Sequence, residues 1–91
     1  MLISYLALID SDENKQKFMR LYEQYKDLMY YVANGVLHDE HLAEDAVQEA
    51  FLRIARNFSK IGDVPCHQTR NFVVIIVRNV SLNILDTKKT F

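Results

Sequence analysis

The sequence predicts an all-α fold, a compact bundle of three or four helices, and three observations favour it. Hydrophobic residues make up 49% of the 91 residues, enough for one domain that buries roughly 60% of the surface of the unfolded chain. The chain holds two glycines and one proline, and so few helix breakers favour long helices over a β architecture with many turns. Apolar residues also recur three and four positions apart, which is the period of a helix with one buried face.

The first long helix shows the clearest period. Asp10, followed three residues later by Glu13, offers a capping box at its start. We therefore expect the helix to begin near Ser11 or Asp12 and to end near Leu37. Its apolar stripe is expected to comprise Phe18, Leu21, Tyr22, Tyr25, Leu28, Met29, Val32, Ala33 and Val36.

A second helix is expected after a short polar turn at His38 and Asp39. Asp39 is placed to cap this helix, which should end before Gly62. Residues 59–68 are rich in turn-forming types, and we expect them to form an exposed loop. The residues expected to face inward from the second helix are Leu42, Ala46, Val47, Ala50, Phe51, Ile54, Ala55 and Phe58.

The third segment is ambiguous when it is considered by itself. Residues 72–77 form an unbroken, largely β-branched apolar run, which propensity alone assigns to a buried strand. No other strand-like run is available to pair with it, and the apolar pattern continues at helical spacing through Val80, Ile84 and Leu85. We therefore expect a helix from about Thr69 to Lys88, within a single domain that occupies residues 1–91.

Charge and composition limit the classes of function. Eleven basic and twelve acidic residues give a formal charge of −1, so the general basic footprint of a nucleic-acid-binding protein is absent. The single cysteine, Cys66, excludes an intramolecular disulfide and fits a reducing cytoplasm. The apolar start at Met1 to Ile9 lacks the basic region of a signal peptide, and no segment approaches the roughly 20 apolar residues that cross a bilayer. We expect a cytoplasmic protein without a membrane anchor.

The outward face of the second helix is the most informative surface. We expect it to carry Glu44, Asp45, Gln48, Glu49, Leu52 and Arg53, with Leu52 as an apolar residue on a polar side. Spacings of three and four place these groups on neighbouring turns, where carboxylates and an amide can engage a partner helix while Leu52 fills a groove. A solvated acidic face with one stray leucine explains the spacing equally well.

The string AEDAVQEAFLRI, residues 43–54, resembles the second conserved region of bacterial RNA polymerase sigma factors. In that family an Asp-x-x-Gln-Glu core on a helix docks on the clamp helices of the polymerase β′ subunit. The opening helix, with KFMRLYEQYKDLMYYVA, is similar to that of the same family. The resemblance implies polymerase docking by Asp45, Gln48, Glu49 and Leu52.

Residues 69–89, TRNFVVIIVRNVSLNILDTKK, resemble the next helix of the extracytoplasmic-function group of sigma factors. Phe72 takes the place of an aromatic residue, often tryptophan, and the helix has fewer arginines than many relatives, so we expect weak DNA affinity for the isolated module. In the family, the preceding loop, here residues 58–70, helps capture a base flipped from the non-template strand of the minus-ten element. The resemblance implies DNA contacts by Asn57, Lys60, Arg70, Arg78, Asn79, Asn83, Lys88 and Lys89.

The function that this resemblance implies is a sigma factor module without enzymatic activity, cofactor or metal. Its partners would be core RNA polymerase and promoter DNA, whose minus-ten element it recognises and melts, and an anti-sigma factor is a further partner that the family allows. The second, upstream-reading domain of such factors, region 4, has no room in 91 residues.

Two functions of other classes remain open at this point. The near-neutral charge and the very apolar third helix favour a helical protein-interaction module that does not bind DNA. A less favoured reading is a small metal-dependent enzyme, with His38 and His41 as metal ligands. Cys66 beside His67 lacks the orienting acid that a nucleophile requires.

Overall fold

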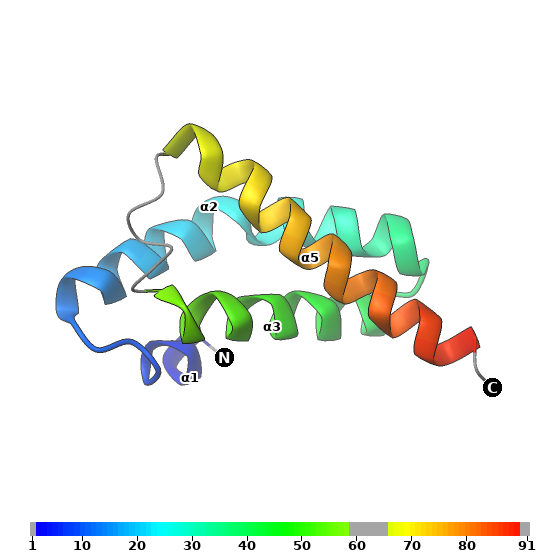
Figure 1. Ribbon diagram of the computed structural model, residues 1–91, viewed down its shortest axis with the longest axis horizontal. Helices are drawn as coiled ribbons and strands as arrows, with labels where there is room; N and C mark the ends of the chain where they lie inside the picture. The colour runs from blue at the N-terminus through cyan, green and yellow to red at the C-terminus, as the bar shows by residue number, and fades with distance from the viewer. Residues whose placement is uncertain (1, 59–65, 90–91) are drawn as a thin grey trace.

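The computed structural model describes residues 2–58 and 66–89, and all regular structure in these ranges is helical (Figure 1). The helices are α1 Leu2–Leu6, α2 Asp12–Leu37, α3 Glu40–Arg56 and α5 Cys66–Lys89. Figure 1 shows α2 and α3 running antiparallel, with α5 crossing them. The three long helices pack against one another in pairs, and α1 contacts both α2 and α3. The all-α bundle that the sequence predicts is confirmed.

Ser11, rather than Asp10, caps the first long helix. Its hydroxyl Oγ accepts a hydrogen bond of 3.1 Å from the backbone N–H of Asn14, and its backbone is extended. The capping box predicted from Asp10 and Glu13 is therefore wrong, although the predicted helix ends are confirmed. Serine and aspartate both cap helices well, so residue type alone does not decide between Ser11 and Asp10. Ile9, directly before them in the chain, is buried in the core.

A tight turn reverses the chain between α2 and α3. His38 ends α2 in the left-handed conformation, with φ of 52°, and its N–H donates to the carbonyl oxygen of Asn34 at 2.8 Å. The Oδ1 atom of Asp39 then accepts from the N–H of Leu42 at 3.0 Å. The predicted cap at Asp39 is confirmed, and the close succession of the two caps makes α2 and α3 neighbours.

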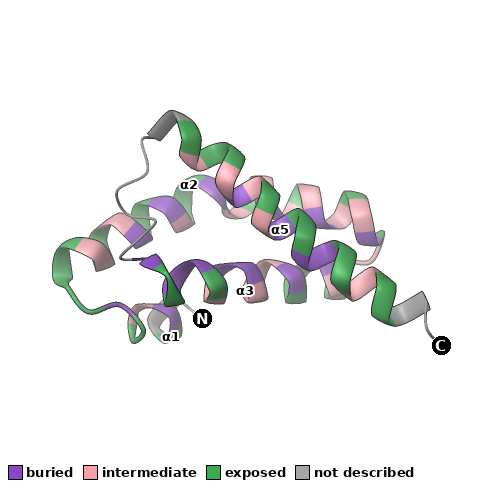
Figure 2. Cartoon of the chain, viewed as in Figure 1, coloured by how far each residue is buried: buried purple, intermediate pink, exposed green. Residues whose placement is uncertain are grey.

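The core lies where the inner faces of the three long helices meet, and Figure 2 shows these faces as the buried positions. Alanines line much of the α3 side, so the neighbouring backbones can approach closely while larger residues fill the space between them. The buried residues of the long helices are Phe18, Leu21, Tyr25, Met29, Ala33 and Leu37 of α2, Ala43, Ala46, Ala50, Phe51, Ile54 and Ala55 of α3, and Val73, Val77, Val80 and Ser81 of α5.

The β-branched run of residues 72–77 is helical, as its context predicts. Val73 and Val77, four residues apart, are fully buried, whereas Ile75 between them is 57% exposed; a strand would place all three on one face. The helix begins at Cys66, three residues before the predicted start, so the loop predicted to reach Gln68 is shorter. Pro65 precedes this start in the sequence, and proline suits the beginning of a helix. Residues 59–65 of that loop lie outside the described residues.

The short helix α1 was not predicted, because its five residues, four of them apolar, are too few to show a period. It belongs to the core through Tyr5, which is 2% exposed, with its ring centroid 5.8 Å from those of both Phe18 and Phe51 and 6.3 Å from that of Tyr22. These tilted rings form an aromatic cluster that joins α1 to α2 and α3.

None of the helices in the described ranges is long and apolar enough to cross a membrane.

Candidate functional site

The residues predicted to dock on polymerase lie on α3, but they are less exposed than predicted. Asp45 is exposed, whereas Gln48 and Glu49 are half-buried. Leu52 is also half-buried and packs against the core. It follows Phe51, which faces fully inward, so it sits at the border of the buried stripe rather than alone on the polar side. The docking face is therefore an edge of α3 that borders the core.

Glu49 already has a partner within α3. Its Oε1 atom lies 3.5 Å from the Nε atom of Arg53, one helical turn away, and both side chains remain partly exposed. An exposed pair of this kind stabilises a helix by only about 0.3–0.5 kcal/mol. A basic side chain of a partner can therefore replace Arg53 as the partner of Glu49 at little cost in free energy. Without a bound partner, the pair keeps the Glu49 carboxylate directed along the helix toward Arg53.

Negative charge gathers at the start of α3. Partial burial raises the pKa of the Tyr30 phenol above its ordinary value, and the nearby carboxylates of Glu40, Glu44 and Asp39 raise this pKa further. The effect shows that the end of α2 lies within the field of these acids. With Asp45 exposed on the same helix, the first half of α3 presents a negative surface to a partner.

His38 and His41, the ligands of the less favoured metal-dependent alternative, are both exposed at this corner. Within residues 2–58 and 66–89, no three His, Cys, Asp or Glu side chains are grouped so that they could hold a metal ion. The side chains of Cys66 and His67 lie outside the described residues.

Three of the residues predicted to contact DNA from α5 lie on its outer side, and the fourth, Arg70, does not. Val73, Val77 and Val80 face the core, and Arg70, seven residues before Val77, lies on the same side of the helix near its start. Arg70, Arg78, Asn79 and Asn83 are all exposed. The outer face of α5 thus carries one guanidinium group and two amides, which can donate to phosphates and to base edges respectively, beside the exposed carboxylate of Asp86.

Of the remaining residues predicted to contact DNA, the structure describes the side chain of Asn57 alone. Asn57 is exposed at the end of α3, where its Nδ2 atom donates a hydrogen bond of 3.0 Å to the carbonyl oxygen of Arg53. The amide thus closes the last turn of the helix, a role that the sequence did not indicate. Lys60 lies outside the described residues, as do the side chains of Lys88 and Lys89, although their backbone continues α5.

Two apolar residues on the outer face of α5 were missed at the level of sequence. Ile75 is 57% exposed and Leu82 is 42% exposed. Both belong to an apolar pattern that the sequence assigns mainly to the core. Their separation of seven residues, out of step with the buried positions Val73, Val77 and Val80, is the signal that could have identified them.

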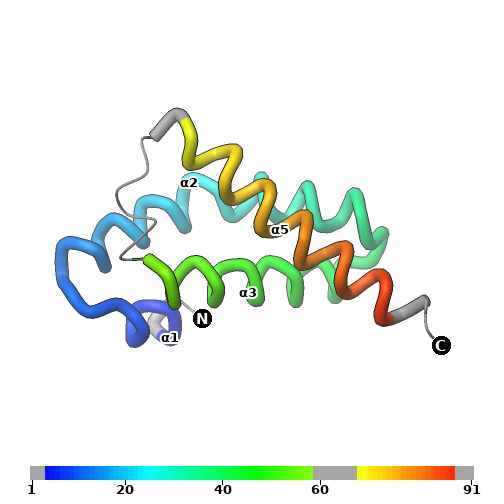
Figure 3. The backbone as a smooth tube through the Cα atoms, in the orientation of Figure 1, coloured from blue at the N-terminus to red at the C-terminus, as the bar shows by residue number. Residues whose placement is uncertain are grey.

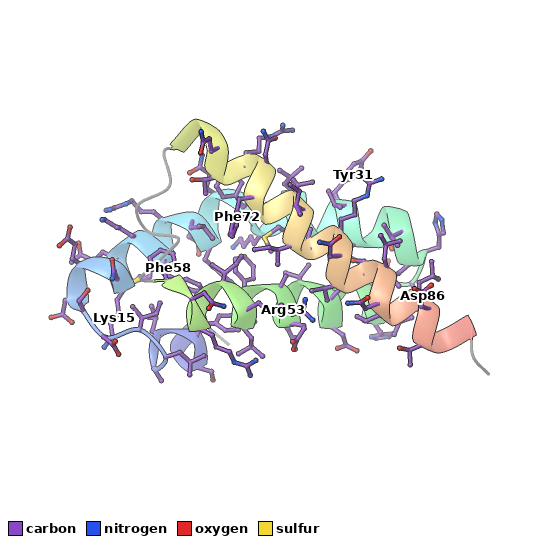
Figure 4. The ribbon with its side chains drawn as sticks, viewed as in Figure 1. Lys15, Tyr31, Arg53, Phe58, Phe72 and Asp86 are labelled. Carbon is purple, nitrogen blue, oxygen red and sulfur yellow. The ribbon has the colours of Figure 1, made fainter. Side chains whose placement is uncertain are left out.

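The two candidate faces belong to one rigid body, because α3 and α5 pack directly against each other and against α2. Figure 3 shows the α5 backbone as one long helix that crosses the pair. In Figure 4, Arg53 marks the α3 face, while the half-buried Phe72 lies in the first half of α5 and the exposed Asp86 lies near its end. An acidic surface on one helix and an arginine and amide surface on another are thus held at fixed relative positions.

A comparison of the sequence with models of known protein families identifies the family of this chain. The model of sigma-70 region 2 matches residues 21–90. The chain belongs to the sigma-70 region 2 family. The matched part of this region 2 domain contains all of α3 and α5 and most of α2. No curated protein and no solved structure matches the chain.

Family membership gives the broad function of the chain. A region 2 domain is a sigma factor module that takes part in RNA polymerase binding and promoter recognition, and the family is not a family of enzymes. The two faces of this region 2 domain lie within the matched residues, whereas α1 precedes them. In the aromatic cluster around Tyr5, the rings of Tyr22 and Phe51 lie within the matched residues, whereas Tyr5 and Phe18 precede them.

Proposed function

We propose that this region 2 domain docks on the β′ clamp helices of core RNA polymerase through α3, and recognises and melts the promoter minus-ten element through α5. The four docking residues are Asp45, Gln48, Glu49 and Leu52. The promoter contacts are Arg70, Arg78, Asn79 and Asn83, with Asn57, Lys60, Lys88 and Lys89 as further members.

The observation that carries the proposal is the separation of charge between two helices that share one core. The acidic start of α3 repels DNA phosphates and attracts basic groups of a protein, whereas Arg78 on the outer face of α5 and Arg70 near the start of that helix attract phosphates. Because the helices pack together, a polymerase bound to α3 holds α5 at a fixed position. The polymerase would then supply most of the electrostatic attraction that a chain of charge −1 lacks.

Melting requires no covalent step in this account. Arginines can hold the phosphates of the opened strand, and the amides of Asn79 and Asn83 can bond to base edges that become accessible only when the strands separate. Binding therefore favours the unpaired strand over the duplex and shifts the population toward the open form.

The docking half of the proposal is tested by capture of core RNA polymerase with the purified domain. We expect the double variant Gln48→Ala/Glu49→Ala to bind polymerase about tenfold to a hundredfold more weakly, because it removes an amide and a carboxylate from the contact. The matched control is Glu23→Ala/Gln24→Ala, which removes the same two residue types from exposed positions on α2 and should bind normally.

The outcomes separate the proposal from its rival. Equal binding by both double variants, with native helical content by circular dichroism, would remove α3 as the docking surface. No capture by the folded wild-type domain would favour a helical protein-interaction module that does not act with polymerase.

A further inference from the structure

Ile75 and Leu82 are apolar residues in an otherwise polar setting. Seven residues separate them, so they lie two turns apart on the same outer face of α5, at a rise of about 10 Å. Arg78 and Asn79 lie between them, each three or four residues from both, and are therefore surface neighbours of both. Each apolar side chain is thus bordered by a guanidinium group and an amide, and Leu82 is also bordered by the exposed carboxylate of Asp86, four residues further on.

This setting is more suitable for a nucleic acid than for a protein partner. The centre of a protein interface is depleted of charge and is continuous in its apolar surface, whereas here an arginine and an asparagine interrupt the apolar surface. A DNA strand presents the matching chemistry in a repeating form. It offers phosphates for the arginine, base edges for the amide and, on thymine alone among the four bases, an exposed methyl group for an aliphatic side chain.

We propose that Ile75 and Leu82 are specificity-determining residues that select thymine by packing against its 5-methyl group. The inference rests on the proposed function, because it requires that the outer face of α5 meets promoter DNA. It deepens that function by naming a base preference. Two residues that cannot form hydrogen bonds read two thymines at different positions, while Arg78 and Asn79 hold the strand between them.

The test uses deoxyuridine, which differs from thymine by the missing methyl group. The complex of core RNA polymerase with this domain is bound to fork-junction DNA, chosen as the tightest binder from a library with a randomised minus-ten segment. Each thymine of the chosen DNA is then replaced singly by deoxyuridine. We expect two positions at which the replacement weakens binding about fourfold, the value for one buried methyl or methylene group.

Variants assign each sensitive position to a residue. Ile75→Ala should remove the deoxyuridine effect at one position and Leu82→Ala at the other. The control Leu8→Ala changes a leucine that is 44% exposed but lies outside α5, and it should leave both effects in place. All three side chains are partly or largely exposed, so the variants should fold.

The possible failures are distinguishable. If the complex binds the chosen DNA tightly and no deoxyuridine replacement matters, the thymine contact is wrong, although the proposed function stands. The same conclusion follows if the effects persist in both α5 variants. If the complex binds no member of the library, the proposed function fails and the inference fails with it.

Discussion

At the scale of the residue, side chains at the helix ends set where the chain turns. Ser11 and Asp39 each accept a hydrogen bond from a backbone N–H three residues ahead, at 3.1 and 3.0 Å. His38 supplies the reversal between α2 and α3 by adopting a left-handed backbone without being glycine. These contacts are local, so residue type predicts that a cap exists more reliably than it predicts which of two neighbours forms it.

The choice between two adjacent caps can be measured. We expect Ser11→Ala to lower the free energy of unfolding by about 1 kcal/mol, because it removes the acceptor for the N–H of Asn14. Asp10→Ala is the matched control and should change stability by less than about 0.5 kcal/mol. Urea denaturation followed by circular dichroism gives both values, and a larger loss for Asp10→Ala would restore the capping box that the sequence suggests.

The candidate docking residues show what a helical period does not resolve. The spacing of Asp45, Gln48 and Glu49 predicts a shared face, and the structure places them on one helix. Spacing does not reveal that Glu49 lies 3.5 Å from Arg53 or that Leu52 packs against the core. Both facts depend on side-chain conformation and on neighbouring helices, which a sequence pattern does not contain.

At the scale of the element, long helices were predictable and the short helix was not. Residues 12–37 span seven turns, so their apolar period repeats often enough to define both the helix and its buried face. The run at residues 72–77 was correctly assigned from its context, because the sequence offers no second strand-like run and the apolar pattern continues at helical spacing beyond it. The five residues of α1 cover little more than one turn, and its place in the fold depends on contacts distant in sequence.

The contribution of α1 can be tested through Tyr5, a large side chain that is buried in the core. We expect Tyr5→Ala to lower the free energy of unfolding by about 3 kcal/mol, since the change leaves a cavity beside Phe18 and Phe51. Tyr5→Phe is the control and keeps the ring, so it should cost less than about 1 kcal/mol. Equal stability of the wild type and Tyr5→Ala in urea denaturation would show that α1 does not hold the core together.

The sequence did not predict which apolar residues of α5 are exposed on its outer face. The polar residues of this face were identified through their resemblance to a family pattern, whereas the exposed Ile75 was hidden within the apolar run of residues 72–77 and Leu82 follows that run between two polar residues. Burial depends on the direction from which the other helices approach. Only the packed structure separates the core valines from the two exposed apolar side chains.

At the scale of the whole molecule, the three long helices form a flat, elongated body of 43 × 26 × 19 Å. A thickness of 19 Å corresponds to about two layers of packed helices, so α3 and α5 each keep a side available to a partner. The start of α3 is acidic, whereas the outer face of α5 carries Arg78 and amides together with one acid, Asp86. The near-zero net charge hides this separation, which is why composition alone argued against DNA binding.

The central claim is that α3 is the surface that meets the β′ clamp helices, and site-specific photo-crosslinking tests it most directly. A photoreactive side chain is placed at Glu44, which is exposed on α3 beside the proposed docking residues, and in a control at Glu23, which is exposed on α2. After incubation with core RNA polymerase and irradiation, we expect a crosslink from position 44 to the clamp helices of β′ and none from position 23. Crosslinks to β′ from position 23 and not from position 44 would contradict the account.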